Sequence, residues 1–388
     1  MRREDAQPIL AGVAAALVGF AGSFAVVLAG LRAIGANHSQ ASSGLLVLSV
    51  TMGITGIVLC WRTRMPVSIA WSTPGAALLI GAGAAHGGYA AALGAFVVSG
   101  LLVVAAGLSR RFEHAIAAIP APLASALLAG VLLPICVSPA RAAVALPGLT
   151  APVIVTWLVL LRIARRLAVL GALVAAGVSL AVDGRLGGGA FTNIAPSLTA
   201  TRPHFELSTM VSLGLPLFLV TMASQNLAGV SVLALHGCRP HLRPILTSTG
   251  FISSAVAPLG GHGINLAAIT AALMAGPDAD PRPERRWIAG AAGSATYLVL
   301  GPAAGLATAF IASSPPLLIE AVAGLALLSA LSAALAAATV EPGHRDAALV
   351  TFATTASGIT ALGLNAPFWG LLAGLVVLAV QRVAPVPA

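Results

Sequence analysis

The chain of 388 residues is 58% hydrophobic and only 8% charged, with three cysteines and a formal net charge of +9. A soluble domain carries roughly 25% charged residues, so this composition indicates an integral membrane protein with little room for a soluble domain. The basic residues are all arginines dispersed between hydrophobic segments, which favours topogenic charges over a nucleic-acid-binding face. The cysteines are isolated and lack metal-ligand spacing, so we expect no metal site and no cofactor.

Fourteen hydrophobic segments are predicted to be membrane-spanning helices. The first is too long for a signal peptide and is interpreted as a span. The segments cover residues 9–31, 44–60, 66–85, 90–108, 115–137, 143–161, 167–182, 207–235, 244–256, 259–275, 287–311, 315–338, 346–363 and 368–381.

The arginines are distributed unevenly between alternate connecting loops. If the N-terminus is cytoplasmic, only four of the 20 basic residues lie outside, namely Arg32, Arg141, Arg185 and Arg202. The remainder then lie on the cytoplasmic side, as the positive-inside rule requires. We therefore predict an inner membrane protein with an even number of spans and both termini in the cytoplasm.

The longest polar connection, residues 183–206, follows the seventh segment and divides the chain into two halves. Because seven is odd, the second half must have the inverted orientation. The third segment of each half is interrupted, by TPG at residues 73–75 and by GGHG at residues 260–263. Interruptions at corresponding positions of inverted halves are typical of secondary transporters. The predicted fold is an all-α polytopic membrane protein, a 7+7 inverted repeat with half-helices in its third and tenth segments.

Both interruptions contain residues that begin helices. Ser72 or Thr73 can cap a helix from about Pro74 to Ala85, and the glycines of the second interruption precede a helix predicted over 264–275. The two N-termini would face the middle of the membrane, where unpaired N–H groups favour an anion. Each helix dipole contributes about 0.3–2 kcal/mol, whereas desolvating a carboxylate costs several kcal/mol. Direct hydrogen bonds and apolar contacts must therefore supply the rest.

Polar side chains in the eighth segment are candidates for these hydrogen bonds. Ser224, Gln225 and Asn226 interrupt an otherwise apolar run, and uncharged amides bind an anion without bringing a buried charge. The alternative to ligand binding for Gln225 and Asn226 is hydrogen bonding between helices. For Thr73 and Pro74 the alternative is a purely structural kink. The candidate substrate-binding residues are Ser72, Thr73, Pro74, Gly75, Ser224, Gln225, Asn226, Gly261, His262, Gly263 and Asn265, the last of which either caps a helix or contacts the ligand.

His262 is the one ionisable side chain that the sequence places near mid-membrane. A histidine there can exchange a proton near neutral pH, which suits proton coupling, while the alternative is a neutral ring bonded to backbone at the glycine turn. Glu320 follows Pro315 and Pro316 and is interpreted as an interfacial acid. Trp71 and Phe24 are expected to pack against other side chains by default.

Three stretches resemble the signatures of the benzoate:proton symporter family, the BenE type: AWSTPGAALL at 70–79, TMASQNLAGV at 221–230 and GGHGINLAAITAAL at 260–273. The resemblance covers nearly the whole chain. It implies a fold similar to uracil permease and the sulfate-type anion exchangers, with a core domain over residues 1–109 and 204–313 and a gate domain over 110–203 and 314–388. It also implies that the ligand lies between the half-helices, beside Gln225 and Asn226.

The resemblance implies benzoate or a similar aromatic carboxylate as the substrate, taken up with a proton. The uracil-permease relatives place glutamates in the eighth and tenth spans, where this chain has Gln225, Asn226 and His262, so their proton route does not transfer. One proton would cancel the cost of about 2.3 kcal/mol per 100 mV for an anion entering a negative interior. A homodimer is compatible with the sequence.

The alternative function is an exchanger or uniporter of another small anion, such as sulfate. An enzyme is not expected, because the sequence has no HExxH motif, no paired intramembrane carboxylates and no serine with a credible base, and so no candidate catalytic residues.

Overall fold

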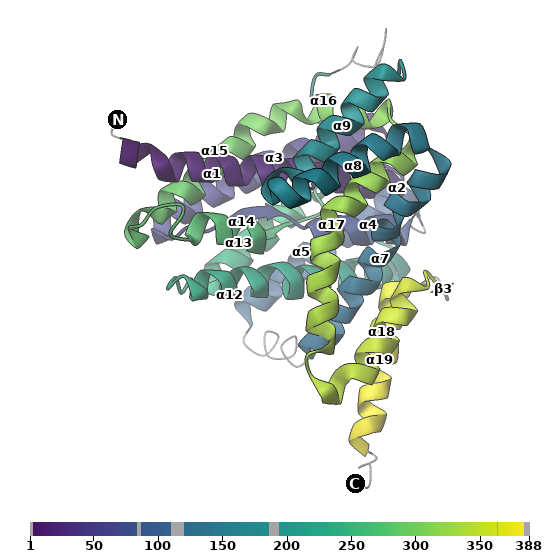
Figure 1. Cartoon of the computed structure of the whole chain (residues 1–388). Coiled ribbons are helices and arrows are strands. Elements are labelled where there is room, and N and C mark those ends of the chain that lie inside the picture. The colour runs from purple at the N-terminus through teal and green to yellow at the C-terminus, as the bar shows by residue number, and fades with distance from the viewer. Residues whose placement is uncertain (1–2, 84–86, 110–119, 186–193, 363, 384–388) are drawn as a thin grey trace.

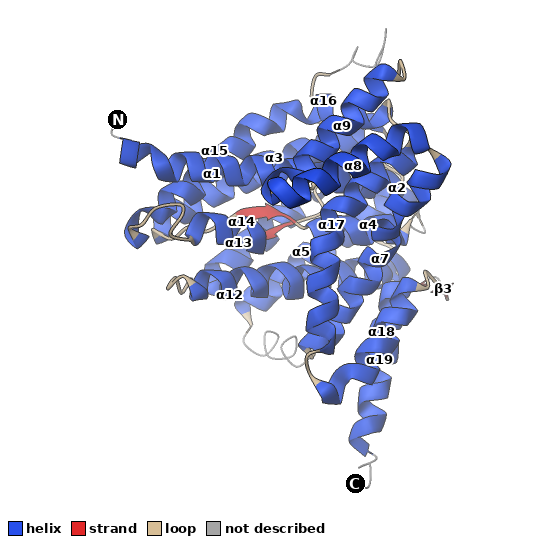
Figure 2. Cartoon of the chain, viewed as in Figure 1, coloured by secondary structure: helices blue, strands red, loops and turns tan. Residues whose placement is uncertain are grey.

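The computed structural model describes residues 3–83, 87–109, 120–185, 194–362 and 364–383, which are mostly helical (Figures 1 and 2). The ends of the predicted third segment (84–85) and the start of the fifth (115–119) lie outside the described residues. So does much of the predicted linker between the halves, at 186–193.

The first half of the chain contains α1 (Arg3–Ala21), α2 (Phe24–Ala33), α3 (His38–Thr63), β1 (Ile69–Trp71), α4 (Thr73–Ala82), α5 (Gly88–Leu108), α7 (Ala121–Ala145), α8 (Pro147–Ile163) and α9 (Ala168–Val182). In the second half, residues 207–235 form one long helical segment: α10 (Leu207–Thr209), α11 (Leu215–Thr221) and α12 (Ala228–Leu235), joined by π-helical turns at Met210–Gly214 and Met222–Leu227. The elements that follow are α13 (Leu242–Val256), β2 (Ile264–Leu266), α14 (Ala268–Ala275), α15 (Arg286–Leu300), α16 (Ala304–Ala312), α17 (Pro316–Thr339), α18 (Arg345–Ala356), β3 (Thr360–Ala361), β4 (Leu364–Asn365) and α19 (Ala366–Val383).

Among the described residues, 7 helical segments are long and apolar enough to cross a membrane: Ala6–Ala33, His38–Thr63, Gly88–Leu108, Ala121–Ala145, Leu207–Leu235, Pro283–Ala312 and Pro316–Thr339. Each overlaps a predicted span. Shorter apolar helices at Thr73–Ala82, Pro147–Ile163, Ala168–Val182 and Ala366–Gln381 overlap others. The chain is therefore a helical membrane protein, while the total of fourteen crossings stays a prediction.

The two interrupted segments meet as a pair of antiparallel strands. Ile69 pairs with Leu266 and Trp71 with Ile264, and the pair lies inside the molecule, surrounded by helices (Figure 2). The prediction that a helix begins at Ile264 was wrong, because residues 264–266 pair with β1 and α14 begins at Ala268. Strand pairing satisfies the backbone N–H and C=O groups that would otherwise be unpaired in the membrane interior. The other short helix begins at Thr73 and ends at Ala82, three residues before the predicted end.

The first predicted span is interrupted as well. α1 ends at Ala21 and α2 begins after Ser23, whose backbone is not helical (φ -142, ψ -12). The Ser23 hydroxyl donates to Gly19 O (2.7 Å) and accepts from the indole N–H of Trp71 (2.9 Å). Trp71 also packs on Phe20, with 5.3 Å between ring centroids, which agrees with the expected aromatic packing.

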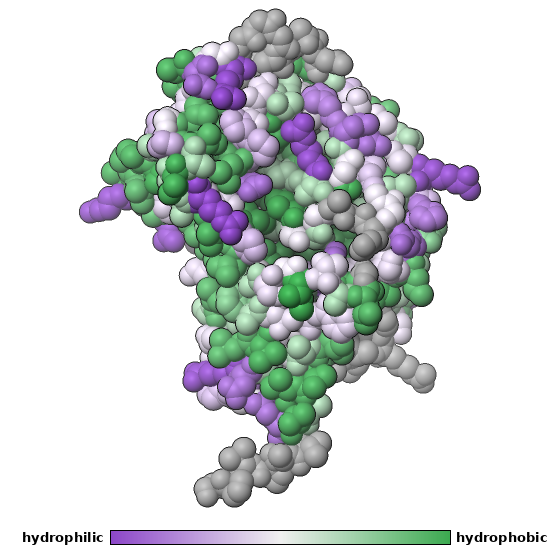
Figure 3. All heavy atoms as spheres, turned by 90° about the vertical axis from the view of Figure 1, so that its right-hand side faces the viewer, coloured by the Kyte–Doolittle hydropathy of each residue, from purple (hydrophilic) through white to green (hydrophobic). Residues whose placement is uncertain are grey.

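The helices pack in two sets of neighbours. In one set, α1 and α3 pack against α15, α5 against α13, and α2 against α4. In the other, α7 packs against α17 and α18, α18 against α19, and α8 against α9, and α17 to α19 extend to the bottom of Figure 1. Small residues allow close approach, since a Cβ added at Gly324 of α17 would lie only 2.3 Å from Ile135 O of α7. The surface in Figure 3 shows hydrophilic residues in separate clusters between broad hydrophobic areas.

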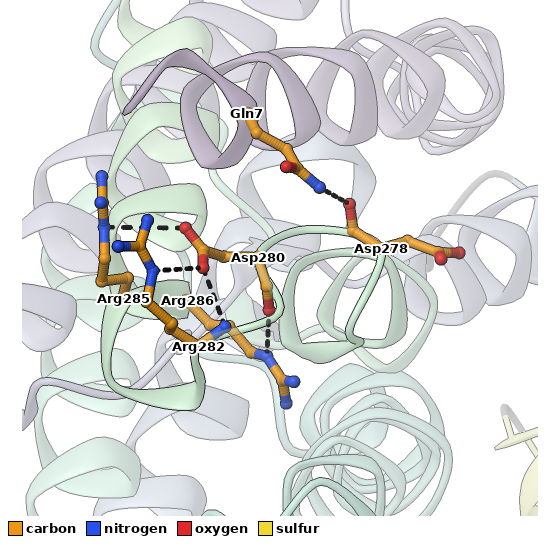
Figure 4. A network of polar contacts seen from close by, with 6 residues as sticks. All are labelled: Gln7, Asp278, Asp280, Arg282, Arg285 and Arg286. Atoms are coloured by element: carbon orange, nitrogen blue, oxygen red, sulfur yellow. Dashed lines mark hydrogen bonds and ion pairs between the residues drawn. The ribbon is translucent and has the colours of Figure 1, made fainter. Parts of the chain in front are cut away.

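Arg286 closes the far end of α14. Its Nη1 donates to Ala275 O and its Nε to Asp280 O, both at 2.9 Å. Figure 4 shows the second of these contacts. Ala275 is the last residue of α14, where unpaired carbonyls and the negative end of the helix dipole favour a cation. The guanidinium therefore fixes this end of the helix to the loop that follows it.

The buried carboxylate of Asp280 organises the same loop. It accepts hydrogen bonds from Arg282 N–H (2.9 Å) and Arg282 Nε (3.3 Å), and lies 3.6 Å from Arg285 Nε. Gln7 Nε2 of α1 donates to Asp278 O (3.2 Å), so the first helix also contacts this loop (Figure 4). The sequence analysis did not predict this network.

We predict that Asp280→Asn lowers thermal stability at pH 7 in a pH-dependent way. Burial acts to raise the pKa of the Asp280 carboxyl, but hydrogen bonds from Arg282 and the charges of Arg282 and Arg285 outweigh burial and hold the pKa below its ordinary value. A carboxyl with a lowered pKa stabilises the folded protein above its unfolded-state pKa, and this stabilisation is lost as the pH falls through the folded-state pKa. The destabilisation should be about 1.5–3 kcal/mol at pH 7 and shrink below about pH 4.

The measurement is thermal unfolding of purified protein in detergent across that pH range. Glu284→Gln is the matched control, because Glu284 lies in the same loop and is exposed. A stability difference between Asp280→Asn and the parent that does not change with pH would contradict the prediction.

Candidate functional site

The start of α4 is built on Ser72. Its buried hydroxyl accepts from Gly75 N–H (3.1 Å) and shares a hydrogen bond with the Thr221 hydroxyl of α11 (2.8 Å). Of the two residues predicted to cap this helix, Ser72 is therefore the one that does so, with Pro74 in the first turn. A side chain at Gly75 would disturb this cap, because a Cβ there would lie 2.7 Å from Ser72 Oγ and 2.9 Å from Ser72 Cβ. The N–H and hydroxyl of Thr73, the first helical residue, have no hydrogen-bond partner within the described ranges.

The glycine turn before β2 is bonded to the same helix start. Gly260 (φ 92) and Gly263 (φ 143) adopt backbone conformations that other residues rarely reach. Gly263 O accepts from Ser72 N–H at 3.2 Å. Gly261 is buried, and its N–H donates to Val256 O (3.1 Å). The turn and the start of α4 therefore form one hydrogen-bonded unit.

His262 lies buried in this unit. Its Nε2 is 3.0 Å from Ser72 O, and its ring packs edge-on against Phe96 of α5. A carbonyl oxygen can only accept, so in this hydrogen bond Nε2 carries the hydrogen and the neutral ring leaves Nδ1 as an acceptor. Nδ1 is buried and has no partner among the described residues. The ring thus makes a hydrogen bond to the backbone, as the structural alternative for His262 expected. It also retains a nitrogen, Nδ1, that can accept a proton.

Asn226 joins the eighth segment to β2. It is fully buried, its Oδ1 accepts from Leu266 N–H (3.1 Å), and its Nδ2 lies 3.3 Å from Met222 Sδ. These contacts match the helix-linking alternative considered for the two amides. Asn265 is similar, because in the amide orientation that satisfies both its polar atoms, Oδ1 accepts from Ser72 N–H (3.0 Å) and Nδ2 donates to Leu266 O (2.7 Å).

Gln225 differs from both asparagines. Its side chain is half-buried and makes no hydrogen bond with the rest of the described structure. Ser224 lies beside it, but the Ser224 hydroxyl donates to Val220 O within its own helix (2.6 Å). Of the three polar residues in this stretch, Gln225 is therefore the one whose donors are free for a ligand.

The eighth segment connects the starts of the two short helices. Thr221 contacts Ser72 before α4, and Asn226 contacts Leu266 before α14. Because the strands are antiparallel, the helix starts lie at opposite ends of the pair, and the register places Ala268 opposite Val67, six residues or about 20 Å along the strand from Thr73. The N–H of Ala268, like that of Thr73, has no partner within the described part of the chain. Unpaired N–H groups at two helix starts, with a free amide on the segment that joins them, form an arrangement suited to an anion.

Two features of this region escaped the sequence analysis. One is the break at Gly22 and Ser23, although a Gly-Ser pair in an apolar helix is a recognised cause of kinks. The other is the π-helical turn at Met222–Leu227, which contains Gln225. The break lies in the first segment of the first half, and the turn lies in the first segment of the second half. A comparison of the two predicted halves would therefore have shown that both first segments are irregular.

Two interrupted segments that meet inside a helical membrane protein are typical of secondary transporters, and comparison with known proteins agrees that the chain is a membrane transporter. The family model described as benzoate membrane transport protein matches residues 4–380. The benzoate membrane transport protein of Acinetobacter baylyi is 31% identical over 371 residues, and inner membrane protein YdcO of Escherichia coli is 36% identical over 371 residues. Both alignments cover 94% of this chain and 93% of the relative.

The chain belongs to the benzoate membrane transport family, as the sequence resemblance predicted. This is a family of membrane transporters, not of enzymes. Among solved structures, the transmembrane domain of a cyanobacterium bicarbonate transporter, BicA, matches with a TM-score of 0.55 and 14% identity. The match covers 99% of this chain and 98% of that one. At this identity the likeness shows a shared fold.

We predict opposite consequences for the two neighbouring amides. Gln225→Ala should weaken substrate binding by about 1.5–3 kcal/mol, through the loss of a hydrogen bond to a charged ligand, with unfolding temperature unchanged. Asn226→Ala leaves the buried Leu266 N–H without a partner and should cost about 1–3 kcal/mol of folding stability.

Ligand binding by calorimetry and unfolding by thermal scan, on each variant, separate the two effects. Ser231→Ala is a control, because Ser231 is exposed on α12 and bonds only to Leu227 O of its own helix. Normal affinity in Gln225→Ala would remove that residue from the site.

Proposed function

We propose that this chain is a secondary active transporter that imports benzoate or a similar aromatic carboxylate together with a proton across the inner membrane. The observation that carries the proposal is the meeting of two interrupted segments, with unpaired N–H groups at both helix starts. Membership of the family and the name of the Acinetobacter relative support the substrate class. The name of the Escherichia coli relative supports the inner membrane, and the arginine distribution supports cytoplasmic termini.

In this proposal the carboxylate binds between the short helices α4 and α14, where the Gln225 amide and the unpaired N–H group at one of the two helix starts, Thr73 or Ala268, donate to it. Uncharged donors suit a ligand that must also leave the site, because they bind the anion without a permanent buried counter-charge. Ser72, Gly75, Gly261, Gly263, Asn226 and Asn265 shape this site through the contacts described above. Pro74 and Ser224 are also among the proposed substrate-binding residues.

We also propose that the first set of packed helices is the core domain and the second set the gate domain, within residues 1–109 and 204–313, and 110–203 and 314–388 respectively. The more extensive packing within each set supports this division, and contacts of α4 with α7 and of α2 with α17 join the two sets. In a 7+7 inverted repeat, movement of one domain against the other would expose the site to each membrane face in turn. A homodimer is compatible with this arrangement.

The coupled proton is assigned to Nδ1 of His262. A proton there makes the ring a cation beside the start of α4, which favours a bound carboxylate, and the carboxylate in turn favours the proton. This reciprocity is what symport requires. Transfer of one anion with one proton is electroneutral, so the membrane potential would not oppose uptake.

Purified protein in proteoliposomes tests the function directly. We expect an inward proton gradient to drive accumulation of radiolabelled benzoate without net current, with competition by salicylate but not by uracil or sulfate. Protein-free vesicles give the baseline for permeation of neutral benzoic acid. Sulfate or another small anion exchanged without pH dependence would support the alternative, an exchanger or uniporter, for which the fold shared with a bicarbonate transporter is the supporting observation.

We predict that His262→Gln retains exchange of benzoate between two membrane faces but loses accumulation driven by a proton gradient. Glutamine preserves a donor toward Ser72 O, so the fold should survive, but it cannot take up the proton. Counterflow and gradient-driven uptake are measured in the same vesicles. His236→Gln is the control, since His236 lies at the end of α12, where its Nδ1 contacts Val232 O. If His262→Gln concentrates benzoate as well as the parent, His262 is structural and the proton travels elsewhere.

A further inference from the structure

A long groove lies along the hairpin of α8 and α9, away from the proposed substrate site. It has a volume of about 960 Å³, and its lining residues all belong to α8, α9 and the residues next to their ends. The groove runs along α9 from Leu167 to Val182, and Asp183 and Arg185 lie at its end. Neither the fold nor the proposed transport mechanism accounts for it.

The groove has a physical cause in the sequence of α9. Gly171 and Ala175 are small residues on one face of the helix, and Leu160 of α8 lies against Gly171, where an added Cβ would be 2.0 Å from Leu160 Cδ1. Val174 and Val178 are larger and border the groove, with 59% and 58% of their surfaces exposed. On the other side, Ala172 and Ala176 pack with residues of α17. The groove is therefore a depression between two packed helices.

The apolar lining of the groove indicates that it is not filled by water. α8 and α9 are apolar helices that overlap the sixth and seventh predicted spans, and the groove is lined mainly by leucine, valine and proline. An apolar depression in the hydrocarbon region is filled by acyl chains, because water there would lack hydrogen-bond partners. A helix of the length of α9 spans about 22 Å, which exceeds the roughly 15 Å depth of one leaflet's hydrocarbon. The groove can thus accommodate a lipid chain along its full length.

The charged end of the groove selects the headgroup. Arg185 Nε and Asp183 Oδ2 are 2.5 Å apart, and each side chain is about half exposed. A headgroup with a phosphate and a primary ammonium complements this pair, with phosphate on the guanidinium and ammonium on the carboxylate. An anionic headgroup would meet the carboxylate of Asp183 unfavourably, and a choline headgroup has no N–H to donate to it.

We propose that the groove between α8 and α9 binds one phospholipid with a zwitterionic, primary-amine headgroup, its acyl chain beside Gly171 and Ala175 and its headgroup at Asp183 and Arg185. The lipid would fill a depression on the segment assigned above to the gate domain. The inference rests on the groove and its charges, and it holds or fails independently of the transported substrate.

Native mass spectrometry of the full-length protein, released from nanodiscs that contain equal parts of phosphatidylethanolamine, phosphatidylcholine and phosphatidylglycerol, tests the proposal. We expect one retained lipid, predominantly phosphatidylethanolamine. Val178→Trp should fill the groove and reduce retention about tenfold, since excluding two methylene groups already has an effect of this size. Val159→Trp is the matched control, because Val159 is an exposed valine of α8 outside the groove, and its retention should equal that of the parent.

A separate variant tests the headgroup assignment. Asp183→Asn removes the carboxylate and should shift retention from phosphatidylethanolamine towards phosphatidylglycerol. Equal retention of the three lipids, or equal loss in Val178→Trp and Val159→Trp, would overturn the proposal. A dimer that Val178→Trp dissociates, with no lipid retained, would instead assign the groove to a second copy of this chain.

Discussion

Backbone hydrogen bonding inside the membrane is the constraint on which this structure depends. A chain interrupted at mid-depth exposes N–H and C=O groups that lipid cannot satisfy, and here each interruption satisfies the other. β1 and β2 pair at Ile69 to Trp71 and Ile264 to Leu266, and Ser72 extends the contact to Gly263. The first helical N–H groups of α4 and α14 have no partners in the described residues, so the same constraint that holds the segments together also leaves donors for the proposed anion site.

The polar residues around the strand pair form two groups, those whose hydrogen bonds are all made within the protein and those that keep free donors. Asn226, Asn265 and Ser72 are fully buried and bond the backbone or another side chain, so they maintain the shape of the interruption. Gln225 and Thr73 are half-buried and keep free donors. His262 combines both conditions, with one ring nitrogen bonded and the other free. The site therefore contains two kinds of residue. Replacing the first kind would disrupt the fold of the interruption, whereas replacing the second kind would only weaken ligand binding.

The short helix α14 is fixed at both ends. Arg286 bonds the last carbonyl of α14, and the buried Asp280 holds the loop that carries Arg286. A helix of eight residues has too few internal hydrogen bonds to be stable alone. Its position, and hence the direction of its N-terminus, therefore depends on the strand pair at one end and on this cationic contact at the other.

The sequence by itself determined the membrane class, the location of both interruptions, a cap at Ser72 or Thr73 and the family, because these depend on composition, on local helix-starting residues and on contiguous motifs. Only the tertiary structure decided that residues 264–266 are a strand, since that outcome depends on a partner nearly 200 residues away in β1. It also distinguished Asn226 from Gln225, which are neighbours of the same chemical type, by burying one against Leu266 and leaving the other half-exposed. Local pattern specifies where a chain can break and which groups are polar, whereas the choice of hydrogen-bond partner is made by segments that meet only after folding.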